Sequence, residues 1–208
     1  MFYPEGFIKE QEESLRGMIG EGKAVIPVSG GITTTVAAVL THRAVGDQAL
    51  IVVVDDGLMR TSELERAMVF FTAQAISPRW VDATQEFLDA LNGLDEPEEQ
   101  RKVYRDTFYS VLGRVIRDEK AQYLVQGTTA ADVVRTEEGM EIPDDIFEQS
   151  GIRAIDPRTY GLTVLEPLRK LNRHEIRKVA RSLGLPPAFS DRQPFPVVVG
   201  LLRPSLVK

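Results

Sequence analysis

The sequence predicts an α/β protein built on an open, mostly parallel twisted sheet with helices on both faces. Short apolar runs alternate with segments of helical periodicity along the chain, and this alternation is typical of strands joined by crossover helices. The run at 49–54 is apolar at every position, which indicates a strand buried on both faces. Ser29, Asp55 and Gln126 fall at strand ends, where open parallel sheets bind their ligands.

Five strands are expected from short apolar runs that contain β-branched or aromatic residues. They occupy residues 24–28, 49–54, 79–81, 123–126 and 162–165. Pro27 is unusual in this set, because a proline cannot donate a ladder hydrogen bond and normally lies at the edge or the end of a strand.

Six helices are expected where apolar residues recur at helical spacing. They occupy residues 4–19, 33–44, 61–75, 84–91, 97–120 and 173–183. Gly20 ends the first and Gly184 the last, and Glu98 and Glu99 lie at the positive end of the dipole of the fifth. The segment 137–160 has no clear periodicity and is rich in acidic residues, so we expect it to form a flexible flap.

Composition is that of a globular protein, with 43% hydrophobic and 27% charged residues, and we expect a single domain over 1–208. The net charge of −6 argues against broad binding to nucleic acid or to anionic membranes. The absence of cysteine excludes disulfides, thiolate metal sites and cysteine nucleophiles, and it fits a cytoplasmic protein. No apolar stretch approaches the ~20 residues that a membrane span needs.

A glycine turn follows the first strand and opens the second helix. It begins at Val28 and continues as Ser29, Gly30, Gly31, Ile32, Thr33, Thr34 and Thr35. Glycines let a ligand approach the backbone, and the N–H groups at a helix start attract an anion. The threonine hydroxyls add further donors for a phosphate. A plain tight turn with a threonine cap explains the same residues equally well.

Several segments together resemble the N-type ATP pyrophosphatases. The glycine turn resembles their pyrophosphate loop, Ser-Gly-Gly-x-Asp-Ser, and residues 52–60 resemble their motif Val-Asp-x-Gly-Leu-x-Arg. Further matches are to the pyrophosphatase domain of GMP synthases. They lie at 95–108, 123–134, 165–186 and 191–196, in the order of that family. The resemblance implies a Rossmann-like fold of the adenine nucleotide alpha hydrolase type.

The resemblance also implies a chemistry and a set of site residues. Members of the family bind ATP with Mg²⁺, transfer AMP to a substrate oxygen and release pyrophosphate. By position, the phosphates would contact Ser29, Gly30, Gly31, Thr34 and Thr35, and Val28 and Thr33 would belong to the same nucleotide-binding site. The adenosine would lie near Val54 and Asp55, the nucleotide would be bordered by Gly127 and Thr128, and a small-molecule acceptor would lie near Asp132.

Each of these site residues also has a structural explanation. Val54 is equally well explained as a strand residue, and Asp55 as part of a turn before Gly57. Thr128 is equally well explained as the cap of the segment that follows its strand. The sequence identifies no catalytic residue and no protein metal ligand.

Three departures from the family pattern concern catalysis and the acceptor. Thr33 stands where the family has an aspartate, and a neutral hydroxyl is a poor ligand for Mg²⁺, so the sequence leaves magnesium in doubt. The triplet 197–199 replaces a glycine-rich segment, and the flap lacks the Lys-Ser-His-His-Asn stretch of GMP synthases. The chain also shows no segment like the glutaminase domain or the C-terminal dimerisation domain of a full synthase.

Three hypotheses remain from the sequence. The first is an adenylating enzyme that uses ATP and a small-molecule acceptor other than xanthosine monophosphate. It would act as a homodimer or with a separate ammonia-supplying subunit. The second is a catalytically degenerate sensor or partner subunit that binds ATP or AMP without turnover. The third is a scaffold that binds no nucleotide.

Overall fold

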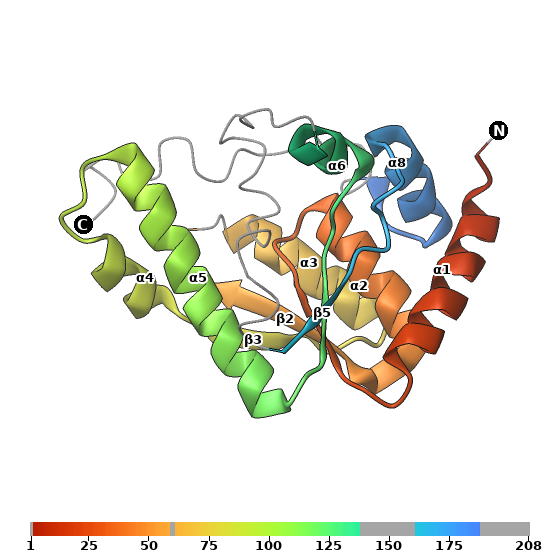
Figure 1. Ribbon diagram of the computed structural model, residues 1–208, viewed down its shortest axis with the longest axis horizontal. Coiled ribbons are helices and arrows are strands. Elements are labelled where there is room, and N and C mark those ends of the chain that lie inside the picture. Colours follow the sequence, from red (N-terminus) through yellow and green to blue (C-terminus); the bar gives the residue numbers. More distant parts are fainter. Residues whose placement is uncertain (1, 59–60, 138–160, 188–208) are drawn as a thin grey trace.

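A computed structural model describes residues 2–58, 61–137 and 161–187 of the chain (Figure 1). These residues form a five-stranded sheet in the order β3–β2–β1–β4–β5, and every neighbouring pair of strands is parallel. The strands are β1 (Ala24–Pro27), β2 (Ala49–Asp55), β3 (Arg79–Asp82), β4 (Tyr123–Val125) and β5 (Thr163–Leu165). The predicted fold class is therefore confirmed.

Helices surround this sheet in the described ranges. They are α1 (Pro4–Ile19), α2 (Ile32–Val45), the short 3-10 helix η1 (Gly46–Gln48), α3 (Thr61–Ala73), α4 (Thr84–Leu91), α5 (Pro97–Glu119), α6 (Ala130–Glu137) and α8 (Arg173–Ser182). None of them combines the length and the apolar character that crossing a bilayer requires.

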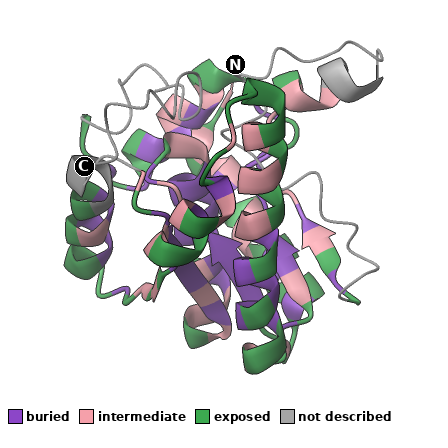
Figure 2. Cartoon of the chain, turned by 90° about the vertical axis from the view of Figure 1, so that its left-hand side faces the viewer, coloured by how far each residue is buried: buried purple, intermediate pink, exposed green. Residues whose placement is uncertain are grey.

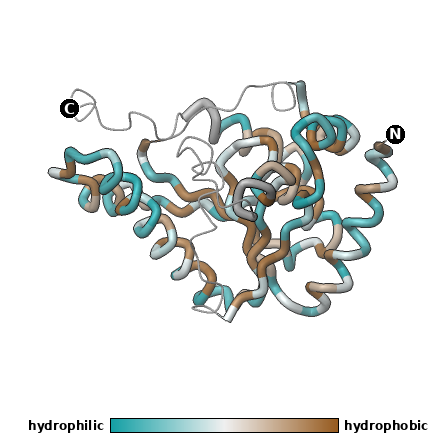
Figure 3. The backbone as a smooth tube through the Cα atoms, turned by 45° about the horizontal axis from the view of Figure 1, so that its top comes forward, coloured by the Kyte–Doolittle hydropathy of each residue, from teal (hydrophilic) through white to brown (hydrophobic). Residues whose placement is uncertain are grey.

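Two apolar clusters cover the opposite faces of the sheet. Successive residues of a strand point to opposite sides, so Ile26 and Ile51 pack with α1, α2, α3 and α8. Val25 and Val52 pack instead with α4 and α5. Figure 1 shows the two groups of helices on either side of the sheet, and Figures 2 and 3 show buried, apolar strands at its centre. This double covering explains the continuous apolar run of β2.

Pro27 lies in β1, which is the central strand of the sheet. It is the last residue of that strand, as expected for a proline. The next residue keeps the ladder with β2, because Val28 N–H donates to the Val52 carbonyl oxygen at 2.9 Å. Pairing with β4 covers Ala24 and Val25 and ends before Pro27.

Predicted and observed elements differ mainly after β4. The helices predicted at 4–19 and 84–91 have the predicted bounds, and the other predicted elements are shifted by one or two residues at their ends. Helix α6 was not expected, and its last residue, Glu137, is also the first residue of the predicted flap. The rest of that flap, 138–160, and the valine triplet at 197–199 lie outside the described residues.

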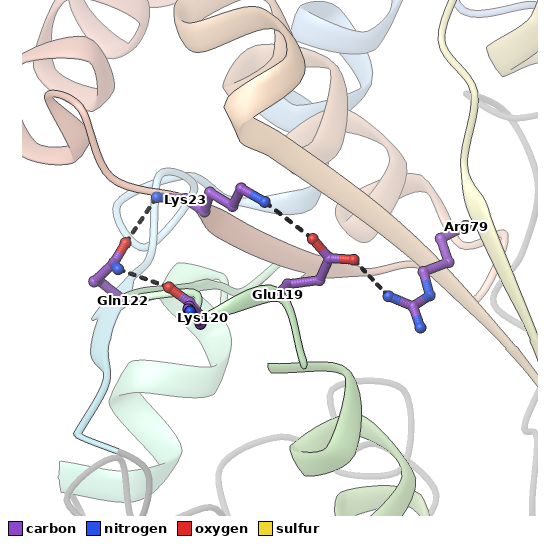
Figure 4. Close-up of polar contacts among 5 residues, drawn as sticks. All are labelled: Lys23, Arg79, Glu119, Lys120 and Gln122. Carbon is purple, nitrogen blue, oxygen red and sulfur yellow. Dashed lines mark hydrogen bonds and ion pairs between the residues drawn. The ribbon is translucent and has the colours of Figure 1, made fainter. Parts of the chain in front are cut away.

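An ion-pair group joins the amino ends of two strands to the end of α5 (Figure 4). The carboxylate of Glu119 accepts from Lys23 Nζ at 3.1 Å and from Arg79 at 2.6 Å. Lys23 directly precedes β1, and Arg79 begins β3. The hydrogen bond from Lys23 is the main cause that lowers the pKa of Glu119 below its ordinary value of 4.5, and Arg79 adds to it.

The substitution Glu119→Gln is expected to lower the free energy of unfolding at pH 7 by about 0.5–1 kcal/mol, the usual range for partly exposed pairs. The pKa of Glu119 is lower in the folded chain than in the unfolded chain. The carboxylate therefore contributes fully above pH 4.5 and loses its contribution as the pH falls through the lower folded value. Urea unfolding at pH 7 and at pH 3 measures this difference, which should shrink at the lower pH.

The matched control is Glu98→Gln, which removes a carboxylate bonded to Arg101 one turn away on α5. The side chain of Glu98 is 79% exposed, so we expect only the small loss, about 0.3 kcal/mol, that an exposed pair and the helix dipole account for. An equal loss for both variants would contradict the proposed role of the Glu119 group.

Candidate functional site

The sheet reverses its strand order between β1 and β4. The chain moves outward from β1 through β2 to β3, and it then returns to the other side of β1 as β4 and β5. The loops that follow β1 and β4 therefore leave neighbouring strands in different directions. This is the position at which open α/β sheets bind their ligands, and both predicted nucleotide loops begin here.

The glycine turn after β1 places its backbone amides at the start of α2. Gly30 has a φ of 78°, a value that favours glycine, and Gly31 is the N-cap residue of α2. No side chain of the described residues caps this helix end. The N–H groups of its first turn are therefore directed beyond the carboxyl edge of the sheet, where they suit an anion.

The three threonines of this helix start differ in their surroundings. Thr34 is buried, and its hydroxyl donates to the Gly31 carbonyl at 3.2 Å and accepts from Ser29 N–H at 3.4 Å. Thr35 is fully buried, and its hydroxyl has no partner among the described residues. Thr33 is half-buried, so it is the threonine of this group whose side chain is most accessible to a ligand.

The loop after β4 packs directly on the glycine turn. A Cβ atom placed on Gly127 would lie 3.0 Å from the Thr33 carbonyl carbon and 3.0 Å from Thr34 N. A side chain at this position would require the neighbouring backbone to shift by a few tenths of an ångström. The next residue, Thr128, is buried and bonds the side chain of Gln126 at 3.4 Å. The structure thus brings the predicted nucleotide-binding residues of the loops after β1 and β4 into contact.

The carboxyl end of β2 holds the next two predicted residues. Val54 is buried and pairs with Val81 of β3. Asp55 is half-buried, and its Oδ1 accepts from Gly57 N–H at 3.0 Å, as the turn interpretation requires. These residues lie at the same edge of the sheet as the glycine turn, one strand away.

Asp132 stabilises the start of helix α6. Its Oδ2 accepts from the backbone N–H of Thr129 at 2.7 Å and from the Thr129 hydroxyl at 2.8 Å. Thr129 directly precedes α6, so this contact resembles half of a capping box. The spacing of Thr129 and Asp132 is a helix-start signal that is visible in the sequence. Asp132 therefore fixes the segment that leads from the β4 loop into α6.

The carboxylates at this edge are engaged with the protein. Asp55, Asp56 and Asp132 each accept hydrogen bonds from the chain, and Thr33 stands where the related loop has an aspartate. Mg²⁺ takes one or two carboxylates together with phosphate oxygens and water. Within the described ranges, no three Asp, Glu or His side chains gather as a metal site. The residues at the turn fit an anion.

Comparisons with known proteins agree with this arrangement of loops. No protein-family model matches the chain. The chain is 43% identical to a subunit of the glutamine-hydrolyzing GMP synthase of Methanopyrus kandleri, over 94% of the chain and 60% of the relative. It is 41% identical to the corresponding subunit of Methanocaldococcus jannaschii, over 94% of the chain and 61% of the relative. The chain is thus related in sequence to these GMP synthase subunits over 94% of its own length.

A solved structure supports the fold of the chain. NMN synthetase from Francisella tularensis superimposes with a TM-score of 0.74 at 13% identity, over 95% of the chain and 78% of that protein. At this identity the likeness shows the fold alone. The chain spans about three fifths of the length of the two GMP synthase relatives.

Proposed function

We propose that the chain binds ATP across the loops of β1, β2 and β4, and that it adenylates a small-molecule acceptor with release of pyrophosphate. The observation that carries the proposal is the contact of Gly127 with the first turn of α2. This contact joins two separate motifs of the family at the topological switch point of the sheet. The identity of 41–43% with the two GMP synthase relatives supports the same chemistry.

In this proposal the chain positions the reactants and stabilises charge. The amides of the glycine turn and the Ser29 and Thr33 side chains hold the phosphates. The backbone of Val54 contacts the adenine, and Asp55 borders the adenosine. An acceptor oxygen attacks the α-phosphorus, the bond to the β-phosphate breaks, and pyrophosphate leaves with the negative charge. Alignment and preorganised donors are the main contributions that a protein makes to such a transfer.

We further propose that ammonia for the second step comes from a separate subunit. The two relatives carry the name of a glutamine-hydrolyzing synthase, and each is named as one of its subunits, which supports a divided enzyme. Ammonia would attack the adenylated carbon, and AMP would leave. A homodimer is compatible with the same chemistry.

The test is a titration calorimetry experiment with ATP, followed by a pyrophosphate assay. Xanthosine monophosphate is the first acceptor, since GMP is the product named for the relatives, and ammonium chloride replaces the separate subunit. We expect ATP binding and one pyrophosphate for each AMP formed, dependent on an acceptor. Binding without pyrophosphate from any acceptor would support the degenerate partner subunit instead. No binding of ATP would reject the proposal.

Thr33→Asp is expected to make ATP binding depend more strongly on Mg²⁺. Without the metal, the added carboxylate repels the phosphates, and we expect the affinity to fall about tenfold, or ~1.4 kcal/mol. With Mg²⁺ the carboxylate gains a partner and the affinity recovers. Calorimetric titrations with and without Mg²⁺ measure the change. The control is Thr33→Asn, because asparagine has nearly the same shape as aspartate and carries no charge. If Mg²⁺ changes the ATP affinity of both variants equally, our placement of Thr33 beside the phosphates is contradicted.

A further inference from the structure

Asp56 is a buried carboxylate that the proposed chemistry does not use. It follows the last residue of β2 and is 1% exposed. Its Oδ1 accepts from Leu58 N–H at 2.8 Å, within its own loop. Its Oδ2 accepts from the hydroxyl of Tyr104 at 2.5 Å. Because Tyr104 lies on α5, this second bond connects the loop after β2 with a helix 48 residues further along the chain.

Packing fixes the position of the Tyr104 hydroxyl. The ring of Tyr104 contacts the ring of Phe87 on α4, with 4.9 Å between the ring centroids. Phe87 is fully buried in the cluster that covers this face of the sheet. The Tyr104 hydroxyl is therefore held in a fixed position by packing, and its hydrogen bond fixes the position of the Asp56 carboxylate.

The loop 55–58 is also held from its other side. Ala83 N–H donates to the carbonyl oxygen of Asp55 at 2.9 Å. A Cβ atom on Gly57 would lie 2.5 Å from Cγ2 of Thr84, at the start of α4. The loop thus lies between the β3–α4 junction and α5, and the Asp56–Tyr104 bond connects it to α5.

We propose that Tyr104, acting through Asp56, is a positioning residue for the adenosine half of the nucleotide. The proposal rests on the function given above, because it requires Asp55 to border the adenosine. The phosphate half is held by the glycine turn after β1, which has its own contacts with Thr34 and Gly127. Loss of the Tyr104 hydroxyl should therefore weaken contacts with adenosine and leave contacts with phosphate unchanged.

The experiment measures the affinity of Tyr104→Phe for AMP and for inorganic pyrophosphate in separate titrations. We expect the affinity for AMP to fall about five- to tenfold, since one hydrogen bond to a charged group is lost. The affinity for pyrophosphate should stay within twofold of the wild type. The matched control is Tyr109→Phe, which removes a phenolic hydroxyl from the same helix. It should leave both affinities unchanged.

A second pair of variants tests the role of Asp56 by rescue. In Asp56→Asn the amide oxygen can accept from Leu58 N–H, and the amide nitrogen can donate to the Tyr104 oxygen. AMP affinity should then stay within about threefold of the wild type. Asp56→Ala offers neither bond and should match Tyr104→Phe, and combining Asp56→Ala with Tyr104→Phe should add little further loss.

Each outcome decides the proposal. Unchanged AMP affinity in Tyr104→Phe overturns it, and so does an equal loss for AMP and pyrophosphate, which would mean a general structural effect. If the wild type binds AMP but no measurable pyrophosphate, the two Asp56 variants decide. Near-normal AMP affinity in Asp56→Asn with a loss in Asp56→Ala supports the proposal, and an equal loss in both overturns it. If the wild type binds neither ATP nor AMP, the proposed function itself fails and this inference fails with it.

Discussion

Gly127→Ala should reduce ATP affinity by at least about tenfold and lower the free energy of unfolding by about 1–3 kcal/mol, the usual range for overpacking. The added Cβ would meet backbone atoms of Thr33 and Thr34 at 3.0 Å. Backbone atoms cannot turn away as the end of a side chain can, so the loop after β4 must move from the start of α2. The two halves of the proposed nucleotide site would then separate. Calorimetric titration and urea unfolding measure the two effects.

Gly17→Ala is the control for this substitution. Gly17 lies within α1, and a Cβ atom there would meet no heavy atom within 4 Å. Alanine has the higher helix propensity, so this variant should gain up to about 1 kcal/mol and bind ATP as the wild type does. Normal ATP affinity in Gly127→Ala would show that the close contact of the two loops is not needed for the site.

Phe87→Ala should lower the free energy of unfolding by about 3–5 kcal/mol, as usual for a large buried aromatic side chain. Phe87 is fully buried between α4 and the sheet and supports the ring of Tyr104. Its removal leaves a cavity that this well-packed face can fill only in part. In a chain of this size each kcal/mol shifts the melting temperature by about 2–4 °C, so a loss near 10 °C is expected in thermal unfolding.

Phe108→Ala is the control for the aromatic substitution. Phe108 is on α5 and only partly buried against the same cluster. We expect it to lose less than half as much unfolding free energy as Phe87→Ala. Similar losses for the two variants would mean that burial at Phe87 does not dominate the stability of this face.

The sheet and most helices could be predicted because their signals are local. The apolar run of β2 and the helical spacing of α1 and α4 lie within short windows of sequence. Helix α6 was not predicted, although Thr129 and Asp132 mark its start. The period of a short helix carries little information, and a cap is then the better signal.

The site was predictable in its motifs and unpredictable in its contacts. The sequence placed the glycine turn and the loop after β4 at strand ends, but it did not reveal that Gly127 touches Thr33 and Thr34. Nor did it reveal that Asp56 binds Tyr104, because partners 48 residues apart leave no local pattern. The hydrogen bonds of the Thr34 hydroxyl were unpredictable for a similar reason, because the orientation of a hydroxyl depends on the folded turn.

Pro27 limits how far β1 can pair with β4. Successive strand residues direct their N–H groups to alternate neighbours. Val28 donates toward β2, so the nitrogen of Pro27 faces β4 and has no hydrogen to give. The ladder between β1 and β4 ends at Val25 and Leu124 and cannot extend through Pro27. The glycine turn and the Gly127 loop begin just beyond the end of this ladder.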